Sequence, residues 1–130
     1  MQITVNLDIP TQRIADLMVT AFEGGSGYWC HASDVALAVP DRAPGTIYYA
    51  DPAFWDGGGQ IIVRYDDPDK DDEGESTGRK VFGLTQLAKG LQIMAEKYPR
   101  HFADFVAEND DADTGDCFLQ CVILGEVVYG

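Results

Sequence analysis

Positive charge is scarce in this sequence of 130 residues. Nine lysine and arginine residues stand against 22 aspartate and glutamate residues, which gives a formal net charge of −13. A field of this sign repels phosphate backbones and anionic membrane surfaces at long range, and it attracts basic partners. We therefore expect neither direct nucleic-acid binding nor membrane binding.

Long apolar runs and a disulfide framework are missing as well. No run reaches the ~18 apolar residues of a membrane span, and the start MQITVNLDIP lacks the flanks of a signal peptide. Three cysteines are an odd number, which suits a reducing cytosol. Cys117 and Cys121 have an i, i+4 spacing that occurs in metal sites, but without a CxxC motif we favour a core role. We predict a cytosolic protein with no metal and no cofactor.

Paired catalytic groups are the third absence. Only two histidines are present, and His31 follows Cys30 on an expected strand, where neighbours point to opposite faces. His101 lies on an expected exposed helix segment. The glycine runs at 24–27 and 57–59 lack the lysine and the spacing of a phosphate-binding loop. We predict no catalytic residues and a protein that is not an enzyme.

Hydrophobic periodicity predicts a single compact α+β domain, because 45% hydrophobic residues suffice for one core. Apolar residues alternate in ITVNL, and they recur with helical spacing from Ile14 to Phe22. We expect a small antiparallel sheet covered on one face by about three helices. The strands are expected at 3–7, 27–35, 60–66 and 79–83, and the helices at 10–23, 85–108 and 114–126, with Tyr98-Pro99 expected to break or kink the second helix. The expected core residues are Ile14, Leu17, Phe22, Leu87, Leu91, Phe118 and Val122.

Three segments have weaker patterns. Residues 66–78 are acidic and nearly free of apolar side chains, which predicts a solvated loop between two strands. Residues 40–59 are rich in proline, glycine and aromatics, so we expect an ordered excursion with a short strand at 46–50, while the conformation of 36–59 as a whole is left open. The C-terminal tail favours a helix over a strand, with an edge strand at 127–129 as the alternative.

The junction FEGGSGYWC, residues 22–30, has two interpretations. Gly24 or Gly25 can end the first helix in the left-handed conformation, in which case Ser26 should be replaceable with little effect. Alternatively, Gly25, Ser26 and Gly27 form a ligand loop beside Tyr28 or Trp29. We favour the helix stop, because the apolar stripe ends at residue 22.

The stretch NDDADTGD, residues 109–116, is superficially similar to a calcium-binding loop. Its alternating ligands at 109, 111 and 113 fit, but the glycine comes one position late and Gln120 stands where a bidentate glutamate is needed. We favour a solvated turn before the last helix. Asp113 and Asp116 have the spacing of a capping box and predict the start of that helix.

The segment FEGGSGYW lies near the end of the first expected helix, and AEKYPRHFADFVAENDDADTGD leads into GDCFLQCVILGEVVYG in the tail. On these residues the chain resembles a family of small uncharacterised proteins encoded by bacteriophages and prophages, and the resemblance covers the two ends, about half of the chain. The resemblance implies a phage accessory protein in the cytoplasm of a bacterial host. Small acidic proteins of this kind often inhibit host defence, and no catalytic residues are carried over.

We therefore expect a non-enzymatic binding protein that antagonises a host defence protein with a basic nucleic-acid-binding surface, in the manner of an anti-CRISPR protein. Carboxylates along the runs 66–75 and 104–116 can take the place of phosphates that face lysine and arginine. The expected partner-binding residues are Asp66, Asp67, Asp69, Asp71, Asp72, Glu73, Glu75, Asp110, Asp111 and Asp113.

Two alternatives remain open for the function. One is a small-ligand binder that sequesters a nucleotide second messenger with an aromatic platform and a basic residue. Its ligand-binding residues would be Tyr28, Trp29, Arg64 and Arg79. The other is a phage structural or accessory protein with no defence role. Self-association is left open in every case.

Overall fold

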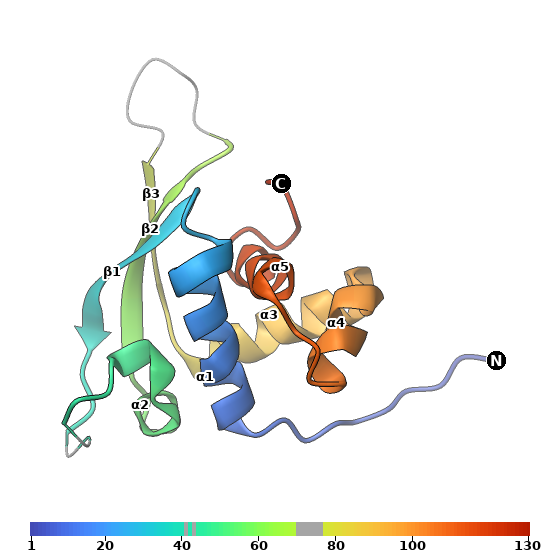
Figure 1. Cartoon of the computed structure of the whole chain (residues 1–130), viewed down its shortest axis with the longest axis horizontal. Coiled ribbons are helices and arrows are strands. Elements are labelled where there is room, and N and C mark those ends of the chain that lie inside the picture. Colours follow the sequence, from blue (N-terminus) through green and yellow to red (C-terminus); the bar gives the residue numbers. More distant parts are fainter. Residues whose placement is uncertain (41, 43, 70–76) are drawn as a thin grey trace.

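A three-stranded antiparallel sheet forms one layer of the protein, and helices α1, α3 and α5 pack on one side of it (Figure 1). The computed structural model describes residues 1–40, 42, 44–69 and 77–130. The strand order is β1-β2-β3, which confirms the expected α+β class. The strands are β1 (Cys30–Leu37), β2 (Gln60–Asp66) and β3 (Thr77–Phe82).

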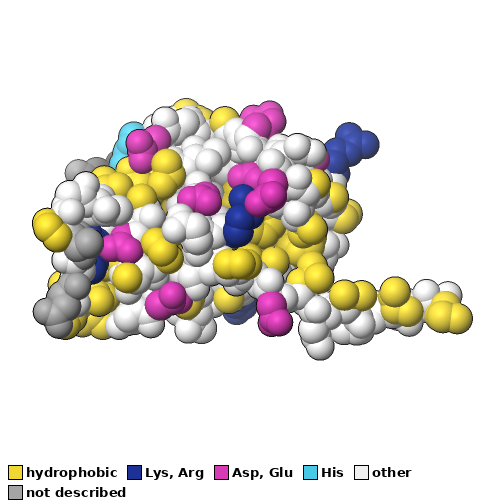
Figure 2. All heavy atoms as spheres, turned by 60° about the horizontal axis from the view of Figure 1, so that its bottom comes forward, with side chains coloured by type: hydrophobic (Ala, Val, Ile, Leu, Met, Phe, Trp, Pro, Cys, Tyr) yellow, Lys and Arg dark blue, Asp and Glu magenta, His cyan; other side chains and the backbone are white. Residues whose placement is uncertain are grey.

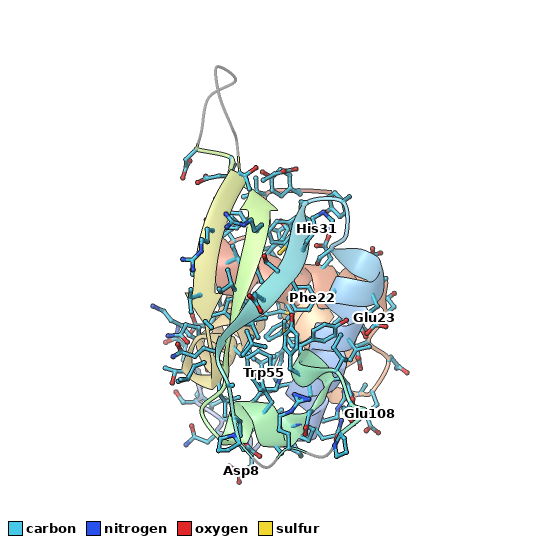
Figure 3. All side chains as sticks on the ribbon, turned by 90° about the vertical axis from the view of Figure 1, so that its left-hand side faces the viewer. Asp8, Phe22, Glu23, His31, Trp55 and Glu108 are labelled. Carbon is cyan, nitrogen blue, oxygen red and sulfur yellow. The ribbon has the colours of Figure 1, made fainter. Side chains whose placement is uncertain are left out.

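The two faces of the sheet follow from the alternation in β2. Ile61 and Val63 are fully buried and point toward the helices, whereas Arg64, the next residue of β2, is exposed. Cross-strand pairing puts Phe82 opposite Ile61 on the inner face and Arg79 opposite Arg64 on the outer face. Figure 3 looks onto this outer face, with His31 of β1 near the β2–β3 tip and Asp8 at the opposite end of the molecule.

Five α-helices and two short helical turns complete the described chain. The most buried helix is α5, where an almost continuous set of residues from Thr114 to Ile123 is buried between α1 and α3. The α-helices are α1 (Thr11–Thr20), α2 (Pro52–Asp56), α3 (Leu84–Lys97), α4 (Pro99–Val106) and α5 (Ala112–Ile123), and the turns are a π-helical turn (Ala21–Gly25) and a 3₁₀ turn (Tyr48–Ala50).

The expected strand at 3–7 is wrong. This segment precedes α1 on the helical side of the molecule, far from the sheet, and it forms no strand (Figure 1). Ile3, Val5 and Leu7 were expected to face the core, but they are 78%, 65% and 52% exposed. The alternation is that of a strand, and what is missing is a sheet edge to pair with.

The helical stretch expected over 85–108 is divided at Tyr98, which confirms the expected break at Tyr98-Pro99, because Pro99 cannot continue the hydrogen bonding of α3 and begins α4 instead. Another expected element differs from the structure. The strand expected at 46–50 is a 3₁₀ turn that leads into α2. There the Asp51 side chain accepts a hydrogen bond from the Ala53 amide at 2.9 Å, and proline at the first helical position favours a helix start.

The C-terminal tail is helical up to Ile123, as favoured. Gly125 ends α5 with a φ of 78°, and its amide donates to the carbonyls of Gln120 and Cys121. The left-handed glycine stop therefore lies at the end of the last helix, and neither Gly24 nor Gly25 has a positive φ. Residues 127–129 are not an edge strand; hydrogen bonds to the Gln120 side chain hold them against α5.

The expected core is largely confirmed. Six of its seven members are buried, and the exception is Phe22, which is half-buried and packs on the Tyr49 ring at 5.0 Å. None of the helices in the described ranges combines the length and the apolar content that crossing a bilayer demands. The expected acidic loop joins β2 to β3 in a hairpin, but Asp71, Asp72, Glu73 and Glu75 lie outside the described residues.

Candidate functional site

The junction FEGGSGYWC ends the first helix, but not by the expected mechanism. After α1 the chain widens into the π-helical turn Ala21–Gly25, which the Ser26 amide closes onto the Ala21 carbonyl at 2.8 Å. Gly25 is required by close packing: a Cβ there would lie 2.1 Å from the carbonyl oxygen of Ala112 in α5. The glycine is structural, as favoured, because α5 approaches the backbone and not because of its φ angle.

Ser26 contradicts the expectation that it is replaceable. Its side chain is completely buried, and its hydroxyl donates to Oδ1 of Asp116 at 2.9 Å. The carbonyl of Ser26 accepts from the amides of Trp29 and Cys30 at 3.1 and 2.9 Å. The Ser26 amide itself donates to the Ala21 carbonyl inside the fold, so it does not point outward as a ligand loop would require.

Asp116 of α5 organises the site. Its Oδ1 accepts from the Ser26 hydroxyl and from the Trp29 indole N–H at 2.7 Å. Its Oδ2 accepts from the Tyr28 hydroxyl at 2.7 Å and from the Gln120 amide at 3.2 Å. A carboxylate has about four lone-pair sites, so these four donors saturate it. Asp116 therefore positions its neighbours and has no lone pair left for a ligand.

Gln120 connects this carboxylate to the C-terminal tail. It is 1% exposed, and its Nε2 also donates to the Tyr129 carbonyl at 3.1 Å. Its Oε1 accepts from the amides of Val128 and Tyr129 at 2.7 and 2.9 Å. Both donors and both acceptor sites of the amide are satisfied, which fixes the tail on α5. The segments FEGGSGYW and GDCFLQCVILGEVVYG thus meet at Asp116 and Gln120.

A pocket of about 420 Å³ opens beside this network. It lies between the first helix end, the start of α4, helix α5 and the tail. Tyr98 accepts the Val127 amide at 2.7 Å on one wall. Nδ1 of His101, on the same wall, is buried and has no hydrogen-bond partner among the described residues. The other polar groups in the lining include Tyr28, Asp113 and Tyr129.

Tyr28 and Tyr129, which both line the pocket, lie in the negative electrostatic field of nearby carboxylates. Their rings meet edge to face, with centroids 6.5 Å apart. Burial and the hydrogen bond to Asp116 raise the pKa of Tyr28 to about 12. Burial, followed by the carboxylates of Asp66, Asp67 and Asp69, also raises the pKa of Tyr129.

We call this surface the acidic tyrosine face and define it as Tyr28, Tyr129, Asp66, Asp67, Asp69 and Asp113. Tyr28 is 56% exposed, so its ring is available to a partner although its hydroxyl is bound. The Tyr129 hydroxyl donates to the Asp66 carbonyl at 2.8 Å, which joins the tail to the end of β2. Carboxylates from the β2–β3 hairpin and from α5 therefore flank one pair of aromatic rings.

Two of the expected partner-binding carboxylates have structural roles instead. Asp110 is 10% exposed and forms an ion pair with Arg13 at 3.0 Å. Asp111 caps α5 by accepting from the Thr114 amide at 3.0 Å, and this bond holds the pKa of Asp111 below its usual value. The helix cap is thus Asp111, two residues before the position expected at Asp113. Asp113 remains exposed.

The four residues of the alternative ligand site are not brought together. Trp29 is 2% exposed and stacks on Tyr129 on the helical side of the sheet. Arg64 and Arg79 are exposed on the outer face, opposite each other in register. The sheet therefore separates the aromatic platform from the two guanidinium groups.

All three cysteines are buried, and two of them, Cys30 and Cys117, are poorly nucleophilic, whereas the hydrogen bond with Cys117 lowers the pKa of Cys121. Burial raises the pKa of the Cys30 thiol to about 12, with a further contribution from nearby carboxylates. A hydrogen bond with Cys121, together with burial, also raises the pKa of Cys117. Thiols with raised pKa values stay protonated near neutral pH. Among the described residues, no group of three or more histidine, cysteine or acidic side chains has the arrangement of a metal site.

Asp116 and Gln120 were missed as a pair in the sequence. The available signal was an acid and an amide four residues apart within an otherwise apolar stretch, which places both on one face of a buried helix. Comparison of the chain with protein-family models, with curated proteins and with solved structures found no match.

Proposed function

We propose that this protein is a non-enzymatic binding protein whose acidic tyrosine face engages a basic surface of a protein partner. The observation that carries the proposal is the exposed Tyr28 ring, held against Tyr129 with carboxylates on both sides. Tyrosine is enriched among the residues that dominate binding energy at interfaces. Its ring face attracts lysine and arginine, and the surrounding carboxylates add long-range attraction.

The rigidity of the surface supports this function. The Tyr28 hydroxyl is bound to Asp116, and the Tyr129 backbone is bound to Gln120 on both its amide and its carbonyl. A ring that is already fixed loses little conformational entropy when a partner binds. The network behind the face therefore contributes to affinity without touching the partner.

The partner class follows from charge and from the resemblance to phage accessory proteins. A net charge of −13 favours association with a strongly basic surface, such as the nucleic-acid channel of a CRISPR or restriction complex. We propose a host defence component of this kind, in the cytoplasm of the bacterial host. Asp66, Asp67 and Asp69 would take positions that phosphates occupy in the nucleic-acid complex.

The test is capture of partners from a lysate of the bacterial host, followed by affinity measurements on the purified partner. Tyr28→Ala should weaken binding at least about tenfold, because it removes an exposed aromatic anchor. Asp113→Asn should weaken it several-fold and reduce its dependence on salt. Asp8→Asn is the matched control, because it removes the same charge from the opposite end of the molecule (Figure 3).

Two outcomes would contradict the proposal. One is capture of a partner whose affinity stays constant between about 50 and about 300 mM salt, since electrostatic association must weaken over this range. The other is a Tyr28→Ala variant that binds as tightly as the Asp8→Asn control. Failure to capture any basic defence protein would favour an accessory role without a defence target.

A further inference from the structure

Residues 1–9, which precede α1, have the sequence pattern of a β-strand but pair with no described strand. We call this segment the arm. Four of the ten exposed large apolar side chains of the described chain belong to it: Met1, Ile3, Val5 and Leu7. Figure 2 shows the arm projecting from the body with hydrophobic side chains along it. Alternating β-branched and polar residues suit one face of a sheet, and such a strand gains from pairing.

The sheet offers two edges, and one of them is open. On β1, the register shifts twice against β2, and the Asp34 side chain already accepts from the Val35 amide at 2.7 Å. Shifts of this kind protect an edge from further pairing. On β3, all six residues pair with β2 without a shift, and the described part of the chain places no strand on its other side.

A groove lies directly beside this β3 edge. It has a volume of about 320 Å³ and a mixed lining, in which Lys80 of β3 and Lys89 of α3 are basic and Ile93, Val122 and Leu124 are apolar. Ile93 and Leu124 are only partly buried. A strand added next to β3 would point alternate side chains into this groove and cover these two residues.

The arm of the same chain lies on the wrong side of α3 to fill this groove. Its own Val5 and Leu7 line a different pocket together with Ala88 and Leu91. Along an α-helix, Ala88 and Leu91 lie on the face roughly opposite Gly90 and Ile93. A second copy of the chain has no such restriction.

We propose that the arm of one copy adds as a fourth strand to the β3 edge of a second copy, with Ile3, Val5 and Leu7 over the groove. Each copy supplies an arm that pairs with no described strand and an edge at residues 78–82 that borders no further described strand, so two copies satisfy each other reciprocally in a closed dimer. The resulting four-stranded sheet contains the segment 3–7, whose alternation is that of a strand.

The test is the oligomeric state of the full chain by sedimentation velocity over a range of concentrations. Val5→Lys should weaken dimerisation at least about tenfold, because it removes an apolar contact and places a positive charge beside Lys80 and Lys89 of the groove. Asn6→Lys is the matched control: it adds the same charge to the neighbouring residue, whose side chain points to the other face. It should leave the dimer intact.

A mixing experiment distinguishes pairing of arm with edge from contact between two arms. Ile93→Asp alters the groove, and Leu124→Asp replaces it where circular dichroism shows that Ile93→Asp does not fold. Each groove or arm variant alone should be monomeric, whereas a one-to-one mixture with Val5→Lys should form a heterodimer with one intact contact. A wild-type protein that stays monomeric up to about 100 µM would overturn the proposal, as would a dimer insensitive to Val5→Lys or a mixture that stays monomeric.

Discussion

Replacing Asp116 with alanine is expected to destabilise the protein by about 2–6 kcal/mol. The Ser26 hydroxyl is completely buried, and the Trp29 side chain is 2% exposed. Both donate to Oδ1, and each would lose its acceptor. A buried donor left without a partner costs about 1–3 kcal/mol, and the two together give the stated range. Tyr28 is exposed enough to bond to water instead, so it adds little.

Asp116→Asn should cost less than alanine, about 1–2 kcal/mol. The amide oxygen can still accept from Ser26 and Trp29, whereas the new NH₂ group meets the Gln120 Nε2 donor, 3.2 Å from the original oxygen. The matched control is Asp113→Ala, one turn earlier on the same helix with an exposed side chain. It should stay within about 0.5 kcal/mol of the wild type.

Urea denaturation followed by far-UV circular dichroism checks this order, at one fixed protein concentration. Far-UV detection is preferred because the fluorescence of Trp29 would respond directly to the substitution. An Asp116→Ala midpoint equal to that of Asp113→Ala would refute the assignment of Asp116 as the organising residue. A double-mutant cycle of Asp116→Asn with Ser26→Ala should show coupling, because the two side chains share a hydrogen bond.

Three further predictions concern the same half of the molecule. Gly25→Ala should destabilise the protein by about 1–3 kcal/mol in urea, because its Cβ would overlap a backbone carbonyl of α5, whereas Gly27→Ala has open space and should be neutral. Phe118→Ala should cost about 3–5 kcal/mol and Phe22→Ala about half as much, since only the first ring is fully buried; equal losses would contradict the core assignment. Tyr28 has a folded pKa of about 12 against 10.0 for the free side chain, so its contribution to stability is present below pH about 10 and is lost between about 10 and 12. Denaturation midpoints of the wild type should therefore fall toward those of Tyr28→Phe as the pH rises through this window, and a constant difference would exclude the effect.

Local patterns in the sequence determined the elements that depend on near neighbours. The 3.6-residue spacing located α1 and the 2-residue alternation located β2, because these periods follow from backbone geometry alone. Pro99 marked the break between α3 and α4 for the same local reason. Charge composition also came from the sequence alone, and it led to the expectation of a basic partner.

Tertiary structure decided every role that depends on distant residues. Nothing near Gly25 in the chain reveals that the Ala112 carbonyl lies against it, and nothing near Ser26 reveals a carboxylate 90 positions away. The sequence suggested a free carboxylate at Asp110, but the fold places the Arg13 guanidinium 3.0 Å from it. The segment 3–7 has the alternation of a strand, but a strand also needs a neighbouring edge, and the edges available to it are set by the packing of the whole chain. The periodicity of a segment is fixed by its own residues, whereas the residues and strands that it contacts are fixed by the fold of the whole chain.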